Sequence, residues 1–176
     1  MRIPVVAGVG RGRTLLSAFD AALNECGMPN CNVIRLGTAI PSGASVFEAD
    51  RTCSSPHEDG DRLYAVMAEY RSERAGRAIA AGIGWYQWLG GRGVIAEHGA
   101  EGDSTIEVEA EVLDLIYASL RDLCETRGVP FDGMRVAWRL ASAEVGVEPA
   151  AVVVLAVYGA EPWERSVVAW PERRAG

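Results

Sequence analysis

Residues 32–41 read NVIRLGTAIP, an apolar run that stops at a glycine and a hydroxyl residue. The run up to Leu36 has the composition of a β-strand, and Pro41 excludes a further ladder donor. A strand end accounts for this much. It does not account for the pair Gly37-Thr38 at the point where a long irregular stretch begins. The junction is therefore either a turn or a reaction centre, and the rest of the chain has to decide between the two.

The stretch after this junction, residues 38–60, contains Pro, Ser, Asp and Gly and shows no periodicity. Loops longer than about 12–15 residues in compact domains tend to be functional or disordered. Around it, apolar runs bounded by turn residues predict seven strands, at residues 3–8, 32–37, 63–70, 77–88, 93–98, 134–142 and 150–158. Gly90-Gly91 is typical of a tight turn, so the two strands that flank it should form a hairpin.

A first amphipathic helix is predicted over residues 13–26, ending at Gly27. It follows GVGRGRT, which we interpret as a glycine-rich turn, because the motif lacks the Walker spacing and the full dinucleotide fingerprint. The apolar stripe of this helix consists of Leu16, Phe19, Ala22 and Leu23.

A second, longer helix is predicted to begin at the capping box Ser104-x-x-Glu107 and to end at Arg127-Gly128. Its buried stripe consists of Val112, Ile116, Leu120, Leu123 and Cys124. Two helices and seven strands predict sheets that pack together with the helices outside. We expect residues 1–163 to form this single domain and residues 164–176 to form a C-terminal tail.

The composition restricts the function. Lys and Arg number 17 against 24 Asp and Glu, a net charge of −7, which argues against nucleic-acid binding and is compatible with a cationic small-molecule substrate. No apolar stretch approaches the roughly 20 residues needed to span a bilayer. The start, MRIPVVAGVG, is too short for a signal peptide. We therefore expect a cytoplasmic protein with no membrane partner.

In that compartment the four cysteines are expected to be free thiols. Cys53 with His57, or Cys26 with Cys31, is the arrangement closest to a metal site. Neither shows the paired close spacing of a zinc site, so no metal is expected.

Three motifs in this order resemble the pyruvoyl-dependent arginine decarboxylase family: VAGVGRGRTLLSAFDAAL, NVIRLGTAIP and GVIAEH. GDRLYAVMAEY and VVVLAVYGAEPW look like an actinobacterial-type branch of it, and the resemblance covers residues 3–163. It implies an α+β fold, a four-layer αββα sandwich of mixed or antiparallel sheets with two long helices. It also implies a homotrimer or a dimer of trimers.

The resemblance implies that the chain cleaves its own backbone. The family does so in an Asn-x-x-x-x-Ser-Ser stretch and turns the second Ser into a covalent pyruvoyl group. Asn32 matches the Asn, Gly37 the first Ser and Thr38 the cofactor precursor, so this chain carries Gly-Thr at the usual Ser-Ser site. A processed Thr38 would leave a 2-oxobutanoyl group, with one methyl more than pyruvoyl. The Asn32 amide is suited to hold the oxyanion that develops during cleavage.

The same resemblance implies roles for two carboxylates. Glu97, in IAEH, matches the acid that returns a proton after CO₂ leaves, and burial of a strand-borne carboxyl raises its pKa as this task requires. Asp20, in SAFDAAL, matches the carboxylate that meets the guanidinium of L-arginine, the substrate expected to give agmatine. His98 follows Glu97, and strand alternation points it to the opposite face.

Three hypotheses remain open at this stage. The first is a self-processing decarboxylase that acts on a small cationic amino acid. The second is an uncleaved, catalytically inactive family member that serves as a binding or scaffold subunit. The third is a cleaved chain whose free N-terminal Thr38 acts as an amidohydrolase-type nucleophile.

Overall fold

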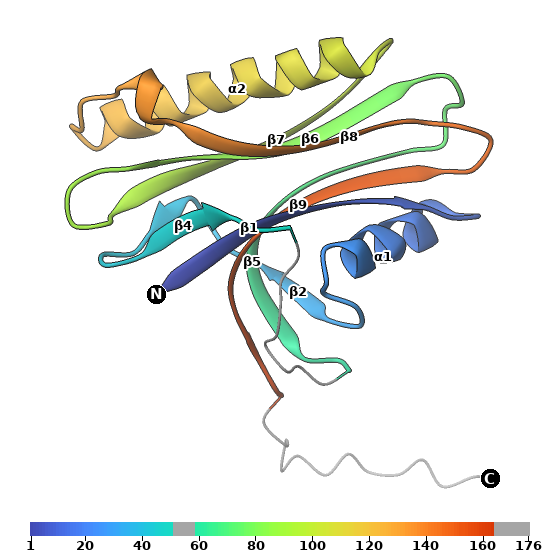
Figure 1. Cartoon of the computed structure of the whole chain (residues 1–176), viewed down its shortest axis with the longest axis horizontal. Helices are drawn as coiled ribbons and strands as arrows, with labels where there is room; N and C mark the ends of the chain where they lie inside the picture. The colour runs from blue at the N-terminus through green and yellow to red at the C-terminus, as the bar shows by residue number, and fades with distance from the viewer. Residues whose placement is uncertain (51–58, 164–176) are drawn as a thin grey trace, which may run out of the picture.

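The computed structural model describes residues 1–50 and 59–163. Two β-sheets pack face to face, and each carries one long helix on its outer face (Figure 1). The predicted α+β sandwich with four layers, αββα, is confirmed. The tail of residues 164–176 lies outside the described residues.

The first sheet has five strands in the order β2-β5-β9-β1-β4. Its central strands β5, β9 and β1 are antiparallel, whereas the edge strands β2 and β4 run parallel to their neighbours, so the sheet is mixed. The strands are β1 (Arg2–Arg11), β2 (Asn32–Arg35), β4 (Ser45–Glu48), β5 (Arg62–Ser72) and β9 (Ala150–Glu161). Helix α1 (Leu15–Glu25) covers its outer face.

The second sheet has four antiparallel strands in the order β3-β7-β6-β8. They are β3 (Ala39–Ile40), β6 (Ala78–Gln87), β7 (Gly93–Gly102) and β8 (Ala137–Glu144). The predicted hairpin is confirmed, because β6 and β7 pair through a turn at Gly90 and Gly91, both with positive φ. Helix α2 (Thr105–Thr126) covers the outer face, and a 3₁₀ turn (Gly133–Arg135) precedes β8.

The face between the sheets is the main core, and it contains fully buried Ile3, Val66, Ile83 and Ile95 among other apolar side chains. A second apolar layer lies between α2 and its sheet. The glycines of β6 allow that helix to come close, because a Cβ on Gly84 would clash with Ile116. This explains why a central strand is so rich in Ala and Gly.

The prediction of a glycine-rich turn at GVGRGRT was wrong. Strand β1 continues through Arg11, so Gly8 and Gly10 are strand residues. A Cβ on Gly10 would clash with the backbone carbonyl of Ala18, so the glycines serve close packing of α1 on β1 rather than chain reversal.

The prediction of which side chains form the apolar stripe of the first helix was partly wrong. Leu16 is 70% exposed, and Ala18 is fully buried in its place. The helix begins after Thr14, whose hydroxyl accepts from the Ser17 N–H at 3.1 Å. In the second helix Ser104 caps the N-terminus as predicted, accepting from the Glu107 N–H at 3.3 Å. Its predicted stripe is buried, with Leu123 at the margin.

The prediction of one long irregular loop over residues 38–60 was also wrong, because β3 and β4 lie in it. The described residues therefore contain nine strands and not seven. Both missed strands are short, and each exists through pairing with a strand distant in sequence: β3 with β7, and β4 with β1.

No helix of the described part of the chain is long and apolar enough to cross a bilayer. Within the same residues no group of three His, Cys, Asp or Glu side chains could hold a metal ion. Cys53 and His57 lie outside the described residues. Cys31 and Cys124 are free thiols.

Candidate active site

The chain passes from one sheet to the other at Gly37-Thr38. Just before it, the Leu36 N–H donates to the Ala65 carbonyl of β5 at 2.9 Å. Just after it, the Thr38 carbonyl accepts from the Ile95 N–H of β7 at 2.8 Å. The peptide bond between Gly37 and Thr38 therefore bridges the two sheets and is anchored on both sides.

Gly37 is exposed and is not among the glycines with positive φ. A Cβ built on it would meet nothing within 4 Å. The local backbone therefore does not require glycine at this position.

A pocket of about 340 Å³ lies beside this junction. It forms at a free stretch of β7, because β3 pairs with β7 only at Val94 and Gly93. The structure thus brings two of the predicted site residues, Thr38 and Glu97, together in one pocket. The lining residues are Thr38, Ala96, Glu97, His98, Ser119, Asp122 and Leu123.

Glu97 lies on β7 two residues beyond Ile95, the residue that holds the Thr38 carbonyl. Its side chain is half-buried, and this burial raises the pKa of the carboxyl above its ordinary value of 4.5. A backbone hydrogen bond and the charge of Arg35 oppose the shift without cancelling it. The carboxyl is therefore suited to carry a proton at a higher pH than an exposed glutamate would.

His98 faces the other side of the sheet from Glu97, as alternation predicted. Its Nε2 lies 2.8 Å from the Ser119 hydroxyl on α2. Burial lowers the pKa of the imidazole, which favours the neutral ring. Glu97 and His98 still line the same pocket, because the pocket extends around the free edge of β7. Sequence reasoning missed the contribution of Ser119, which only the packing of α2 on β7 brings to the site.

Arg127, just after the last turn of α2, is a second group that the sequence did not assign. One guanidinium nitrogen donates to the Thr38 hydroxyl at 3.5 Å, and the other donates to the Leu123 carbonyl at 2.9 Å. In the sequence it indicates only a helix end. In the structure its positive charge lies beside the hydroxyl proposed to react, where it favours negative charge on oxygen.

Asn32 is not brought to Thr38. It begins β2, whereas Thr38 lies beyond the end of that strand. Its side-chain amide donates to the Gly60 carbonyl at 2.6 Å, and its backbone N–H donates to Asp61 at 2.7 Å. In this uncleaved chain Asn32 therefore holds the start of β2 against the residues that lead into β5.

Asp20 is not brought to the pocket either. It is exposed on α1, which packs on β1, β9 and β5, while the pocket lies against the other sheet. A recess of about 510 Å³ is lined by Ala21 and Asn24 of the same helix but not by Asp20. The recess also holds the carboxylates of Glu25 and Asp50.

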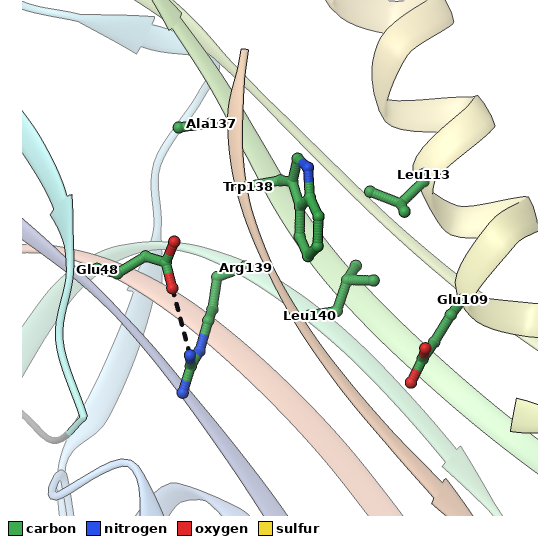
Figure 2. Close-up of a pocket in the computed structure, with 7 residues that line it drawn as sticks. All are labelled: Glu48, Glu109, Leu113, Ala137, Trp138, Arg139 and Leu140. Carbon is green, nitrogen blue, oxygen red and sulfur yellow. Dashed lines mark hydrogen bonds and ion pairs between the residues drawn. The ribbon is translucent and has the colours of Figure 1, made fainter. Parts of the chain in front are cut away.

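A further recess of about 470 Å³ follows strand β8 (Figure 2). Glu48 and Arg139 form an ion pair of 3.3 Å on one side of this strand, and Trp138 lies on the other (Figure 2). Arg139 lines both recesses. They therefore lie at the edge of the sandwich formed by β4 and β8, whereas the pocket of Thr38 lies at the opposite edge, near β2 and β3.

A sequence model of the pyruvoyl-dependent arginine decarboxylase family, PvlArgDC, matches residues 2–162. The chain belongs to this family. The predicted resemblance is thereby confirmed, and it covers nearly all of the residues that the structure describes.

Curated members of the PvlArgDC family show the same relationship. A pyruvoyl-dependent arginine decarboxylase of Halobacterium salinarum is 31% identical over 160 residues, which is 90% of this chain and 94% of the relative. The protein of that name from Picrophilus torridus is 29% identical over 106 residues, 57% of this chain and 56% of the relative. Pyruvoyl-dependent arginine decarboxylase 2 of Archaeoglobus fulgidus is 33% identical over 100 residues, which is 54% of this chain and 62% of the relative.

Membership in the PvlArgDC family implies a covalent pyruvoyl-type group. The residues at the junction fit the precursor of such a group. Thr38 carries the hydroxyl that the chemistry needs, the residue before it is exposed, and a carboxyl with a raised pKa lines the same pocket.

Proposed function

We propose that this chain is a self-processing, α-ketoacyl-dependent decarboxylase that converts L-arginine to agmatine and CO₂. The observation that supports the proposal is the pocket that holds both Thr38 and Glu97 next to the exposed Gly37. The names of its relatives supply the substrate.

Self-cleavage would begin with the Thr38 hydroxyl oxygen attacking the Gly37 carbonyl carbon. The C–N bond breaks, the nitrogen takes a proton, and an ester joins Gly37 to the Thr38 side chain. Loss of the α-proton of Thr38 then expels the Gly37 carboxylate by cleavage of the Cβ–Oγ bond. One water molecule hydrolyses the resulting imine to ammonia and a 2-oxobutanoyl end. Arg127, whose guanidinium lies 3.5 Å from the hydroxyl, would stabilise the negative charge that develops in the first step.

In turnover, the α-ketoacyl group supplies an electron sink for the carbon that loses CO₂. Glu97 would hold the proton that this carbon needs. Its half-buried position keeps the carboxyl protonated above the ordinary range, and its place two residues from Ile95 brings it to the reacting end of the new chain. His98, neutral and bonded to Ser119, would form the wall on the α2 side.

The pocket of one chain lacks Asp20, and we propose that a neighbouring copy supplies it. Thr38 lines a pocket against the second sheet, whereas Asp20 is exposed on α1, which covers the outer face of the first sheet. A head-to-tail contact between two different surfaces of the chain forms a closed ring when the rotation closes. In a homotrimer, or a dimer of trimers, Asp20 of one copy would meet the guanidinium of arginine bound at the next.

The test is an assay of the purified protein after processing is complete. L-arginine should yield agmatine and CO₂ in equal amounts, and L-lysine and L-ornithine should react less well, because only a planar guanidinium makes a bidentate pair with a carboxylate. Failure of fully cleaved protein to release CO₂ from arginine would contradict the proposal. The nucleophile hypothesis would then be favoured if residue 38 carried a free amine, and the scaffold hypothesis if the chain were intact.

A further inference from the structure

The hydroxyl of Tyr158 reaches across the sandwich to the processing segment. It donates to the Ala39 carbonyl at 2.9 Å. Ala39 directly follows Thr38, and Tyr158 belongs to β9 in the other sheet. The side chain is half-buried against the core between the sheets. This hydrogen bond therefore ties the residue after the proposed cleavage point to the centre of the opposite sheet.

The Ala39 carbonyl has no partner in its own ladder. In an antiparallel pair, successive residues direct their backbone groups alternately toward the partner strand and away from it. The Thr38 carbonyl points to β7 and accepts from Ile95, so the Ala39 carbonyl points away. Strand β3 is the edge of its sheet and is two residues long, so no further strand can supply a donor there. Tyr158 supplies the donor.

We infer that Tyr158 is a positioning residue for self-cleavage at Gly37–Thr38 and for the chain end that cleavage creates. The inference rests on the proposed function. Once the bond breaks, Gly37 stays with β2 and the first sheet, and residue 38 becomes the free start of a chain. That start is held by the Ile95 N–H, by the short pairing of β3 and by Tyr158. The alignment of the reacting group with Glu97 then depends on these few contacts.

The Tyr158 hydroxyl can donate this hydrogen bond at any pH well below its pKa. Burial raises the pKa of Tyr158 to about 12, so the phenol keeps its proton and continues to donate. A phenylalanine of nearly the same shape would keep the packing and lose only this hydrogen bond.

The chain offers a matched control in Tyr86. Its hydroxyl also donates to a backbone carbonyl, that of Pro130, at 3.1 Å. Tyr86 is buried in the layer between α2 and its sheet, and it does not line the pocket of Thr38. Tyr86→Phe therefore measures the general cost of removing a tyrosine-to-backbone hydrogen bond.

The experiment follows the cleaved fraction over time by intact mass spectrometry for wild type, Tyr158→Phe and Tyr86→Phe, and then measures kcat and KM on arginine for the fully cleaved proteins. Tyr158→Phe should slow cleavage and lower kcat by about two- to tenfold with KM little changed, the range expected for one neutral hydrogen bond. Tyr86→Phe should match wild type in both rates. Thermal unfolding of the two variants should shift by similar amounts.

Two outcomes would overturn the inference while leaving the proposed function intact: cleavage and kcat of Tyr158→Phe equal to wild type, or equal slowing in both variants. A wild-type chain that stays uncleaved would instead contradict the proposed function, and the inference would fall with it.

Discussion

The carbonyl of Thr38 accepts a hydrogen bond from the N–H of Ile95 at 2.8 Å. This pairing fixes the junction of the two sheets against the strand that carries Glu97, and it joins the proposed precursor to the proposed acid through one short stretch of β7. The position of the acid is thus set by backbone register, which tolerates little slippage when one face of the strand is buried.

Replacing Thr38 by Ser should speed self-cleavage. The change removes a methyl that restricts χ1 and crowds the hydroxyl during attack, and it yields a pyruvoyl end in place of 2-oxobutanoyl. The cleaved fraction of purified protein, followed over time by intact mass, should rise faster than in wild type. Thr38→Ala, which lacks the hydroxyl, is the control and should remain one chain. Cleavage of Thr38→Ala would contradict the assignment of the nucleophile.

Replacing Glu97 by Gln should leave self-cleavage intact and lower decarboxylation of arginine by about 10²- to 10⁴-fold, the usual contribution of a general acid. In wild type the rate should fall as the pH rises through the raised pKa of Glu97, because the protonated carboxyl is the active form. Glu101→Gln, on the same strand but outside the pocket, should keep its turnover. Equal loss in both variants would indicate damage to the strand instead.

The same carboxyl should also affect stability. Because the pKa of Glu97 is higher in the folded chain than in the unfolded one, its favourable contribution is complete below its ordinary pKa of 4.5 and is lost as the pH rises through the raised pKa. Glu97→Gln, which cannot ionise, should therefore unfold at a higher temperature than wild type at neutral pH and at nearly the same temperature below pH 4.5. A difference that is independent of pH would contradict the direction of the shift.

Much of this fold was readable from the sequence, and the failures have physical causes. Alternation along GVIAEH placed Glu97 and His98 on opposite faces, because a strand buried by an outer helix has a strict period. The strands β3 and β4 were missed because two and four residues carry too little pattern, and only distant partners make them strands. The glycines of β1 were misread as a turn because the reason for them is the close packing of α1 on β1. That contact is made in the folded chain and cannot be seen in a local motif.

The arrangement of the site was less predictable. The motifs indicate Asp20, Asn32, Thr38 and Glu97 as a set, but their separation depends on sheet order and on which face each helix covers. In this fold Asp20 lies on the helix that covers the first sheet, whereas Thr38 lines a pocket against the second sheet. Ser119 reaches the pocket, and Arg127 reaches the Thr38 hydroxyl, only through the packing of α2, which no local pattern encodes.

Co-expression of two impaired variants tests whether Asp20 acts in a neighbouring copy. Asp20→Ala alone should raise KM for arginine about ten- to a hundredfold, from loss of a charge-assisted pair. Chains with Asp20→Ala mixed with chains with Glu97→Gln should form some sites with an intact Glu97 and a neighbour's intact Asp20. With random mixing in a ring, about a quarter of the sites are complete. Activity no higher than the sum of the separate variants would show that the two residues do not meet across copies.

The central claim is that the chain cuts itself between Gly37 and Thr38, and intact mass spectrometry of the purified wild-type protein tests it most directly. The account predicts two pieces, residues 1–37 and residues 38–176, with the larger one beginning in a 2-oxobutanoyl group and having no free amine at its start. A single full-length chain of 176 residues, still folded after long incubation, would contradict it.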